Sequence, residues 1–98
     1  MPQKIVLYWR DIPAQVIVKQ RRVTAKRELS KRFIEAIDLC AMRVGAKDSD
    51  AYLAEWRKGE PEPVEGDMEA LADAAAEAIE AEYTKDRLKE LIANEGRA

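Results

Sequence analysis

The spacing of the apolar residues changes at Ser30, and this change restricts the chain to a fold in which strands precede helices. In residues 4–29, β-branched and aromatic side chains alternate with polar ones over short runs, which is typical of strands. After Ser30, apolar residues recur every three or four positions, which is the period of an amphipathic helix. We therefore predict an α+β fold: a short antiparallel meander of two or three strands packed on helices, forming one domain over residues 1–98.

The first strand is predicted at residues 4–10. Alternation along this strand directs Ile5, Leu7 and Trp9 to one face and Tyr8 to the other. A bare sheet of two or three strands is marginally stable in water, so we expect the Trp9 face to pack under a helix.

A proline is predicted to set the first corner of the meander. Pro13 fixes its own φ and pushes Ile12 into an extended conformation, so residues 11–15 are predicted as a stiff turn. A second strand at residues 16–20 and a third at residues 23–29 complete the meander.

Two helices are predicted in residues 30–58. Ser30 is a good N-cap for the first helix, and Gly45 follows its apolar stripe as the C′ residue. Asp48 is predicted to cap the second helix and Gly59 to end it.

An acidic connector and one long helix are predicted to complete the chain. Residues 59–66 contain two prolines and two glycines, which favour an extended, exposed segment. Residues 67–94 read as a single helix with an alanine-rich centre. Small side chains allow close packing, so this C-terminal helix either docks on its own domain or mediates homo-oligomer formation.

The composition excludes several kinds of catalytic site. Histidine is absent and Cys40 is the single cysteine, so the chain can form neither a Ser-His-Asp nor a Cys-His arrangement, and no intrachain disulfide. Cys40 falls on the apolar stripe of the first helix and is predicted to be a core residue. Asp48 and Asp50 lack the other ligands of a calcium loop. We expect no catalytic residue, metal or cofactor, although carboxylate or lysine chemistry stays open.

The charge is divided between the two parts of the chain. Residues 1–32 hold nine Lys and Arg against two acids, whereas residues 33–98 hold eight against seventeen. The simplest interpretation is that acidic helices fold against basic strands; the alternative is a surface for a charged partner. A nucleic-acid partner is not expected, because the basic strands offer only Tyr8 for base stacking and the whole-chain pI is 5.3.

No targeting or membrane segment is expected. Apolar runs are far shorter than the 18 or so residues of a membrane span. The N-terminus lacks the apolar region and cleavage site of a signal peptide. A cytoplasmic location is the resulting expectation, with no membrane partner.

The stretch YWRDIPAQV, residues 8–16, is the best candidate for a binding surface. Tyr8, Arg10 and Asp11 place an aromatic ring, a planar cation and a hydrogen-bond acceptor beside the predicted corner. Tyrosine and arginine are enriched in interface hot spots. The alternative is a local Arg10–Asp11 contact beside an exposed ring, which contributes little.

Three stretches carry a resemblance to a known family. YWRDIPAQVIVKQ, RFIEAIDLCAMRVGA and DAYLAEWR resemble the small bacterial virulence factor domain family. Similar domains are free-standing or form part of conserved virulence factor C proteins, which carry HEAT-type helical repeats. The resemblance covers residues 4 to about 58, and the C-terminal helix weakly.

The resemblance and the periodicity together divide the candidate residues into two sets. The predicted binding residues are Tyr8, Arg10, Asp11, Gln15, Arg32 and Asp38. The predicted structural residues are Trp9, Pro13, Phe33, Tyr52 and Trp56.

The resulting functional hypothesis is a protein-binding adaptor or accessory subunit that uses the corner and the neighbouring basic strands. The family name describes a phenotype rather than a mechanism, and the resemblance implies a link to folate- and corrinoid-dependent methyl transfer. Two alternatives stay open: a small enzyme or cofactor-binding protein of that pathway, and a nucleic-acid-binding domain.

Overall fold

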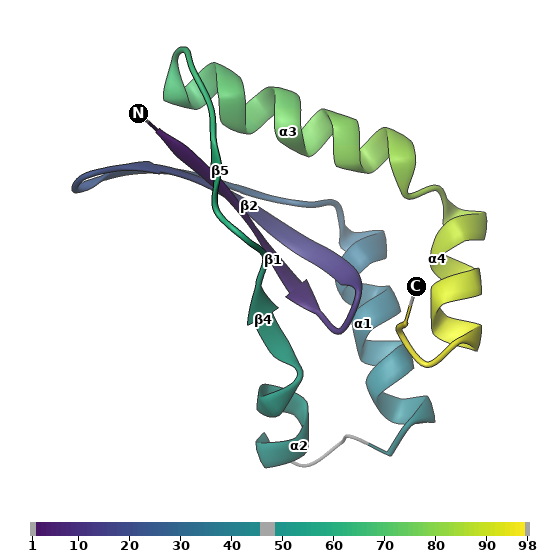
Figure 1. Cartoon of the computed structure of the whole chain (residues 1–98). Helices are drawn as coiled ribbons and strands as arrows, with labels where there is room; N and C mark the ends of the chain where they lie inside the picture. The colour runs from purple at the N-terminus through teal and green to yellow at the C-terminus, as the bar shows by residue number, and fades with distance from the viewer. Residues whose placement is uncertain (1, 46–48, 98) are drawn as a thin grey trace.

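Strands and helices follow one another in the order expected of an α+β protein, but with more strands than predicted (Figure 1). The structure, a computed structural model, describes residues 2–45 and 49–97. Its elements are β1 (Gln3–Trp9), β2 (Ile12–Gln20), β3 (Val23–Glu28), α1 (Lys31–Arg43), α2 (Ser49–Ala54), β4 (Trp56–Lys58), β5 (Glu62–Pro63), α3 (Met68–Glu82) and α4 (Lys85–Ala93). The α+β class and the helical C-terminus are confirmed. The predicted cap at Asp48 lies outside the described residues.

The strands form one antiparallel sheet in the order β3-β2-β1-β4, and β5 also pairs with β1. Helix α3 runs along one face of the sheet, while α1 and α4 pack together beyond its end (Figure 1). Pairing of Ile5 with Ile17 and of Lys4 with Val18 fixes the register of β1 against β2. Because side chains alternate along a strand, Val18 lies on the α3 face and Ile5 on the opposite face.

The first turn is displaced from its predicted position. Arg10 and Asp11 form the two-residue connection between β1 and β2, and Arg10 adopts a left-handed φ of 54°. Pro13 instead lies inside β2 and is fully buried. The register shifts there, so that Leu7 pairs with Gln15 but Tyr8 pairs with Pro13. A bulge of this kind is where a strand tolerates proline, which has no N–H to donate to the ladder.

The second predicted helix is shorter than expected. It ends at Ala54, and Trp56–Lys58 form β4 instead of a last helical turn. The edge of β1 explains this difference: Trp56 pairs with Trp9, and the N–H of Gly59 donates to the carbonyl of Val6 at 2.8 Å. Tertiary pairing therefore overrides the helical spacing of residues 52–56.

The predicted helix over residues 67–94 is two helices. Helix α3 ends at Glu82, and Thr84 caps α4 by accepting a hydrogen bond from the N–H of Arg87 at 3.3 Å. The guanidinium of Arg32 donates to the carbonyls of Glu80 at 2.6 Å and Tyr83 at 3.1 Å. It thereby satisfies carbonyls that a continuous helix would have bonded internally.

Two apolar clusters hold these layers together. The larger lies between the end of the sheet, α1 and α4; its buried members are Trp9, Ile12, Phe33, Ala36, Ile37, Cys40, Ala41, Leu88 and Leu91. The smaller lies under α3; its buried members are Val16, Val18, Ala25 and Ala72. Helix α1 begins after Ser30 and ends before Gly45 at φ +77°, so both bounds are as predicted. The Ser30 hydroxyl donates to Glu80 at 2.9 Å instead of capping an N–H of α1. Trp9 therefore lies under the first helix, as its position in the strand pattern predicts.

Candidate functional site

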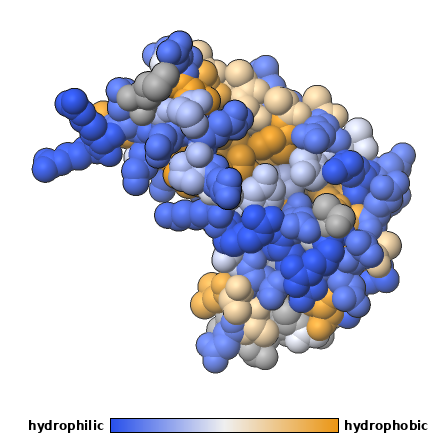
Figure 2. Space-filling model, in the orientation of Figure 1, coloured by the Kyte–Doolittle hydropathy of each residue, from blue (hydrophilic) through white to orange (hydrophobic). Residues whose placement is uncertain are grey.

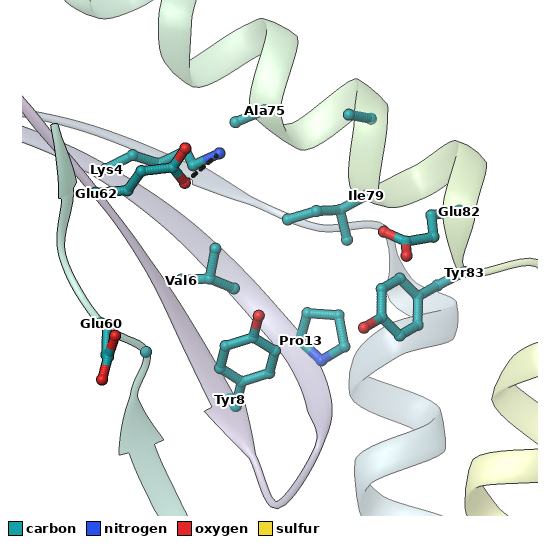
Figure 3. Close-up of a pocket in the computed structure, with 12 residues that line it drawn as sticks. Lys4, Val6, Tyr8, Pro13, Glu60, Glu62, Ala75, Ile79, Glu82 and Tyr83 are labelled. Carbon is teal, nitrogen blue, oxygen red and sulfur yellow. Dashed lines mark ion pairs between the residues drawn. The ribbon is translucent and has the colours of Figure 1, made fainter. Parts of the chain in front are cut away.

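A cleft of about 300 Å³ opens between α3, β1 and residues 59–62 (Figure 3). Tyr8 and Tyr83 both line it, one from β1 and the other from the C-terminal end of α3. We call it the tyrosine cleft. Its lining contains Tyr8, one of the two aromatic residues in the stretch YWRDIPAQV.

The floor of the tyrosine cleft is apolar. Val6 and Pro13 come from the sheet, and Ala75, Ala78 and Ile79 come from α3. On this side of the molecule, a hydrophobic area lies between α3 and the strands and is surrounded by hydrophilic residues (Figure 2). The floor can therefore bury an aliphatic chain whose end is polar.

Both tyrosine rings of the cleft are stacked against arginines. The guanidinium carbon of Arg57 lies 4.6 Å from the ring centroid of Tyr8, and that of Arg87 lies 5.0 Å from the ring centroid of Tyr83. Burial raises the pKa of Tyr83, and the neighbouring Tyr8 and Glu82 act in the same direction. The Tyr83 phenol is therefore neutral at physiological pH and can both donate and accept a hydrogen bond.

Carboxylates outnumber cations in the lining. The lining includes the carboxylates of Glu60, Glu62 and Glu82 and one ammonium, that of Lys4, which lies 3.3 Å from the Glu62 carboxylate. Glu82 lies beside Tyr83 at the α3 wall, whereas Glu60 points away from the floor (Figure 3). Within the described residues Glu82 forms no ion pair, so the cleft has an acceptor with spare capacity.

Gly59 shapes one wall of the cleft rather than ending a helix. A Cβ at this position would lie 3.0 Å from Cε2 of Tyr8 and 3.2 Å from the Val6 carbonyl. Because Gly59 has no side chain, residues 59–62 can pass close to the Tyr8 ring.

Arg10, predicted to point outward, is directed into the protein. Its Nε donates to Glu55 at 2.7 Å, its Nη1 donates to the Glu95 carbonyl at 2.7 Å, and its side chain is 15% exposed. The neighbouring Asp11 is bonded through its N–H to the Gly96 carbonyl at 2.8 Å. The turn is thus fixed to the C-terminal segment, and the binding roles of these two residues stay predictions.

Arg57 joins three of the predicted binding residues. It stacks on Tyr8, its Nε donates to the Arg10 carbonyl at 3.0 Å, and its Nη2 donates to Asp11 at 2.8 Å. Arg57, a residue of β4, therefore connects the first turn to the tyrosine ring at the cleft.

The other three predicted binding residues lie elsewhere. Gln15 pairs with Leu7 and is on the sheet face opposite Tyr8. Arg32 is engaged at the end of α3, where it also forms an ion pair with Glu80 at 3.0 Å. Asp38 is on the exposed side of α1. The structure therefore does not gather the six predicted residues into one site.

The predicted structural residues are packed around the sheet end. Trp9 and Phe33 are buried, and the indole N–H of Trp9 donates to the Tyr52 carbonyl at 2.9 Å. Tyr52 and Trp56 are partly buried and meet edge to face, with ring centroids 6.0 Å apart.

The sequence model of the virulence factor family matches residues 7–92, which include the cleft tyrosines, the turn and most of both C-terminal helices. The chain belongs to the virulence factor family. The resemblance seen in the sequence is thereby confirmed, and the match extends it through α3 and most of α4. No curated protein and no solved structure matches the chain. The family match assigns no specific activity.

The sequence did not indicate three residues of this family domain that form or border the cleft. Glu82 and Tyr83 line it, and Arg57 lies on the Tyr8 ring. Arg57 falls in a segment that reads as helix, so its place beside β1 is visible only in the fold. Tyr83 reads as part of a helical stripe. Thr84 followed by Asp86 is an N-terminal helix signal, and it indicates that the chain turns after Tyr83.

The single thiol of this family domain is a core group. Cys40 is fully buried, and burial raises the pKa of its thiol, so the reactive thiolate is scarce. We expect the native protein to resist iodoacetamide near neutral pH and to be alkylated at Cys40 once it is unfolded in urea. Intact-mass spectrometry measures both, and rapid alkylation of the native protein would contradict the burial.

The described residues contain neither a cluster of metal ligands nor a membrane-spanning helix. Across residues 2–45 and 49–97, no group of three or more His, Cys, Asp or Glu side chains is arranged to hold a metal ion. In the same part of the chain, every helix is too short or too polar to cross a membrane.

Proposed function

We propose that this virulence factor family domain is a protein-binding adaptor whose recognition site is the tyrosine cleft, and that the cleft takes a cationic side chain of the partner. The observation that carries the proposal is the combination of an apolar floor with two phenols and the carboxylate of Glu82, which forms no ion pair within the described residues. Lysine and arginine side chains have the matching structure, an aliphatic stem with a charged end.

The bound side chain would contact both the apolar floor and the polar wall of the cleft. Its methylene groups would cover Val6 and Ile79, and its charged end would face Glu82 and the hydroxyl of Tyr83. Hydrogen bonds from a cation to a carboxylate are about twice as strong as neutral ones.

The rigidity of the site favours recognition. Gly59 lies close to the Tyr8 ring, and Arg57 connects that ring to the first turn, which is fixed to the C-terminal segment. A site that is already ordered loses little conformational entropy when it binds, so more of the contact energy appears as affinity.

Affinity capture from native cell extract tests the adaptor function. We expect Glu82→Lys to lose a partner that the wild-type protein retains, because the new ammonium repels the bound cation. Glu77→Lys is the matched control: it makes the same charge change on the exposed side of the same helix, outside the cleft lining. Equal capture by wild type and both variants would contradict the proposal. Recovery of a folate- or corrinoid-linked methyltransferase would connect the domain to one-carbon metabolism.

A titration with Nα-acetyl-L-arginine amide tests the chemistry of the cleft directly. NMR should show shifts of the Tyr8 and Tyr83 ring signals, and Glu82→Gln should weaken binding by about tenfold through loss of one charge-assisted hydrogen bond. Nα-acetyl-L-glutamate should leave the rings unshifted. Shifts that do not involve these rings would place the cation site elsewhere.

A further inference from the structure

The sheet face opposite α3 combines aliphatic and basic side chains. Ile5 and Ile17 are direct cross-strand partners, Leu7 follows Ile5 on the same face, and all three are partly buried. The register places Lys19, Lys26 and Lys58 on this face as well, and each of these lysines is exposed. We call these six residues the open sheet face. It is distinct from the tyrosine cleft, which lies on the α3 side.

The charge of the open sheet face is not neutralised within the described part of the chain, where its three lysines form no ion pair. Arg27 provides the contrast. It is next to Lys26 on β3 but points to the α3 side, where it bonds to Asp73 at 2.6 Å and to Glu69. Helix α3 therefore neutralises the cation on its own side of the sheet. The other side holds these three lysines against the carboxylate of Glu28, which pairs with Gln15, so its charge is net positive.

Helix α3 shows which kind of element this sheet accepts. Its apolar side buries Ala72 against Val16 and Val18, and its acidic side chains reach the cation at the sheet edge. The open sheet face offers the same two components, an aliphatic centre and a basic border. We infer that the open sheet face binds an acidic amphipathic helix of a partner protein.

A groove at one end of the open sheet face supports this inference. Leu7 continues into a cavity of about 310 Å³ whose lining includes the apolar side chains of Trp56 and Ile34 and one residue of each charge, Lys31 and Glu28. Ile34 is 44% exposed although it belongs to α1. A helix laid across the strands would place a bulky apolar side chain in this groove and its carboxylates beside the lysines. A phosphate backbone would bury none of the aliphatic centre, and a helix covers it.

The two sides of the sheet are therefore expected to bind ligands of opposite charge. The tyrosine cleft presents carboxylates, and the open sheet face presents ammonium groups. The helix site does not depend on the cleft, because it rests on different residues and on the other face of the sheet.

A synthetic peptide tests the inference. The probe is the α3 sequence, residues 67–82, acetylated, amidated and held helical by a hydrocarbon staple on its outer side. We expect NMR shifts at Ile5, Leu7 and Ile17, and we expect Lys19→Glu/Lys26→Glu to weaken binding by about tenfold or more.

Two comparisons make the test decisive. Lys85→Glu/Lys89→Glu makes the same charge change on exposed positions of α4 and should leave the affinity within about twofold. Equal weakening by both double variants would show a response to net charge and overturn the inference. Shifts confined to Val16 and Val18, which mean that the peptide displaces α3, would also overturn it. Glu82→Lys should not affect peptide binding, so failure here is separable from failure of the cleft proposal.

Discussion

Replacing Trp9 with alanine should destabilise the protein by about 3 to 5 kcal/mol, the usual cost of truncating a large buried aromatic residue. Trp9 is 0% exposed, contacts the α1 cluster, and donates its indole N–H to the Tyr52 carbonyl. The substitution removes this contact area and leaves a buried acceptor without its donor. Urea denaturation followed by circular dichroism measures the loss.

Trp56 is the matched control for Trp9. It has the same side chain and pairs with Trp9 across β1 and β4, but it is only partly buried. Trp56→Ala should lower the free energy of unfolding by about 1 to 2 kcal/mol. Equal losses of stability in the two variants would mean that the two indoles do not differ in burial.

Replacing Arg10 with alanine should lower the free energy of unfolding by about 2 kcal/mol and the melting temperature by roughly 10 °C. The change removes a mostly buried ion pair with Glu55 and a charge-assisted hydrogen bond to the Glu95 carbonyl. Arg97, 3.6 Å from the same Glu55 carboxylate, offsets part of the loss. Alanine keeps the Cβ, so the strain of the left-handed φ is the same before and after.

Arg22→Ala controls for the loss of one positive charge, because Arg22 is exposed in the turn between β2 and β3. It should leave the melting temperature within about 2 °C, as surface substitutions usually do. A double-mutant cycle with Glu55→Ala isolates the pair. An unchanged melting temperature for Arg10→Ala would instead support the outward-facing, binding role predicted from the sequence.

Local patterns predicted most of the first half of the fold; the exception is the first turn, which lies at Arg10 and Asp11 rather than at residues 11–15. Alternating β-branched residues mark β1, β2 and β3, because a pleated surface buried on one side needs that period. Ser30 and Gly45 mark the bounds of α1, because each suits the backbone conformation at its end of a helix. These signals lie within a few residues of the element they specify.

The errors arise where distant segments compete with local preference. Residues 56–58 have helical spacing, but pairing with the β1 edge gives them strand geometry. The helix predicted over residues 67–94 is interrupted where Thr84 caps α4, and Arg32, some fifty positions earlier, donates to the carbonyls of Glu80 and Tyr83 at this break. Neither partner can be found by reading along one segment.

The amino-acid sequence by itself determined the α+β class, the family and the burial of Trp9, because periodicity and motifs are local properties of the chain. Only the tertiary structure decided which side chains meet. It turned Arg10 inward, separated Gln15 from Tyr8 by the thickness of the sheet, and brought Tyr83 to the cleft that contains Tyr8. The physical reason is that a site is formed by contacts between elements, and the register and packing of those elements depend on residues far apart in the chain.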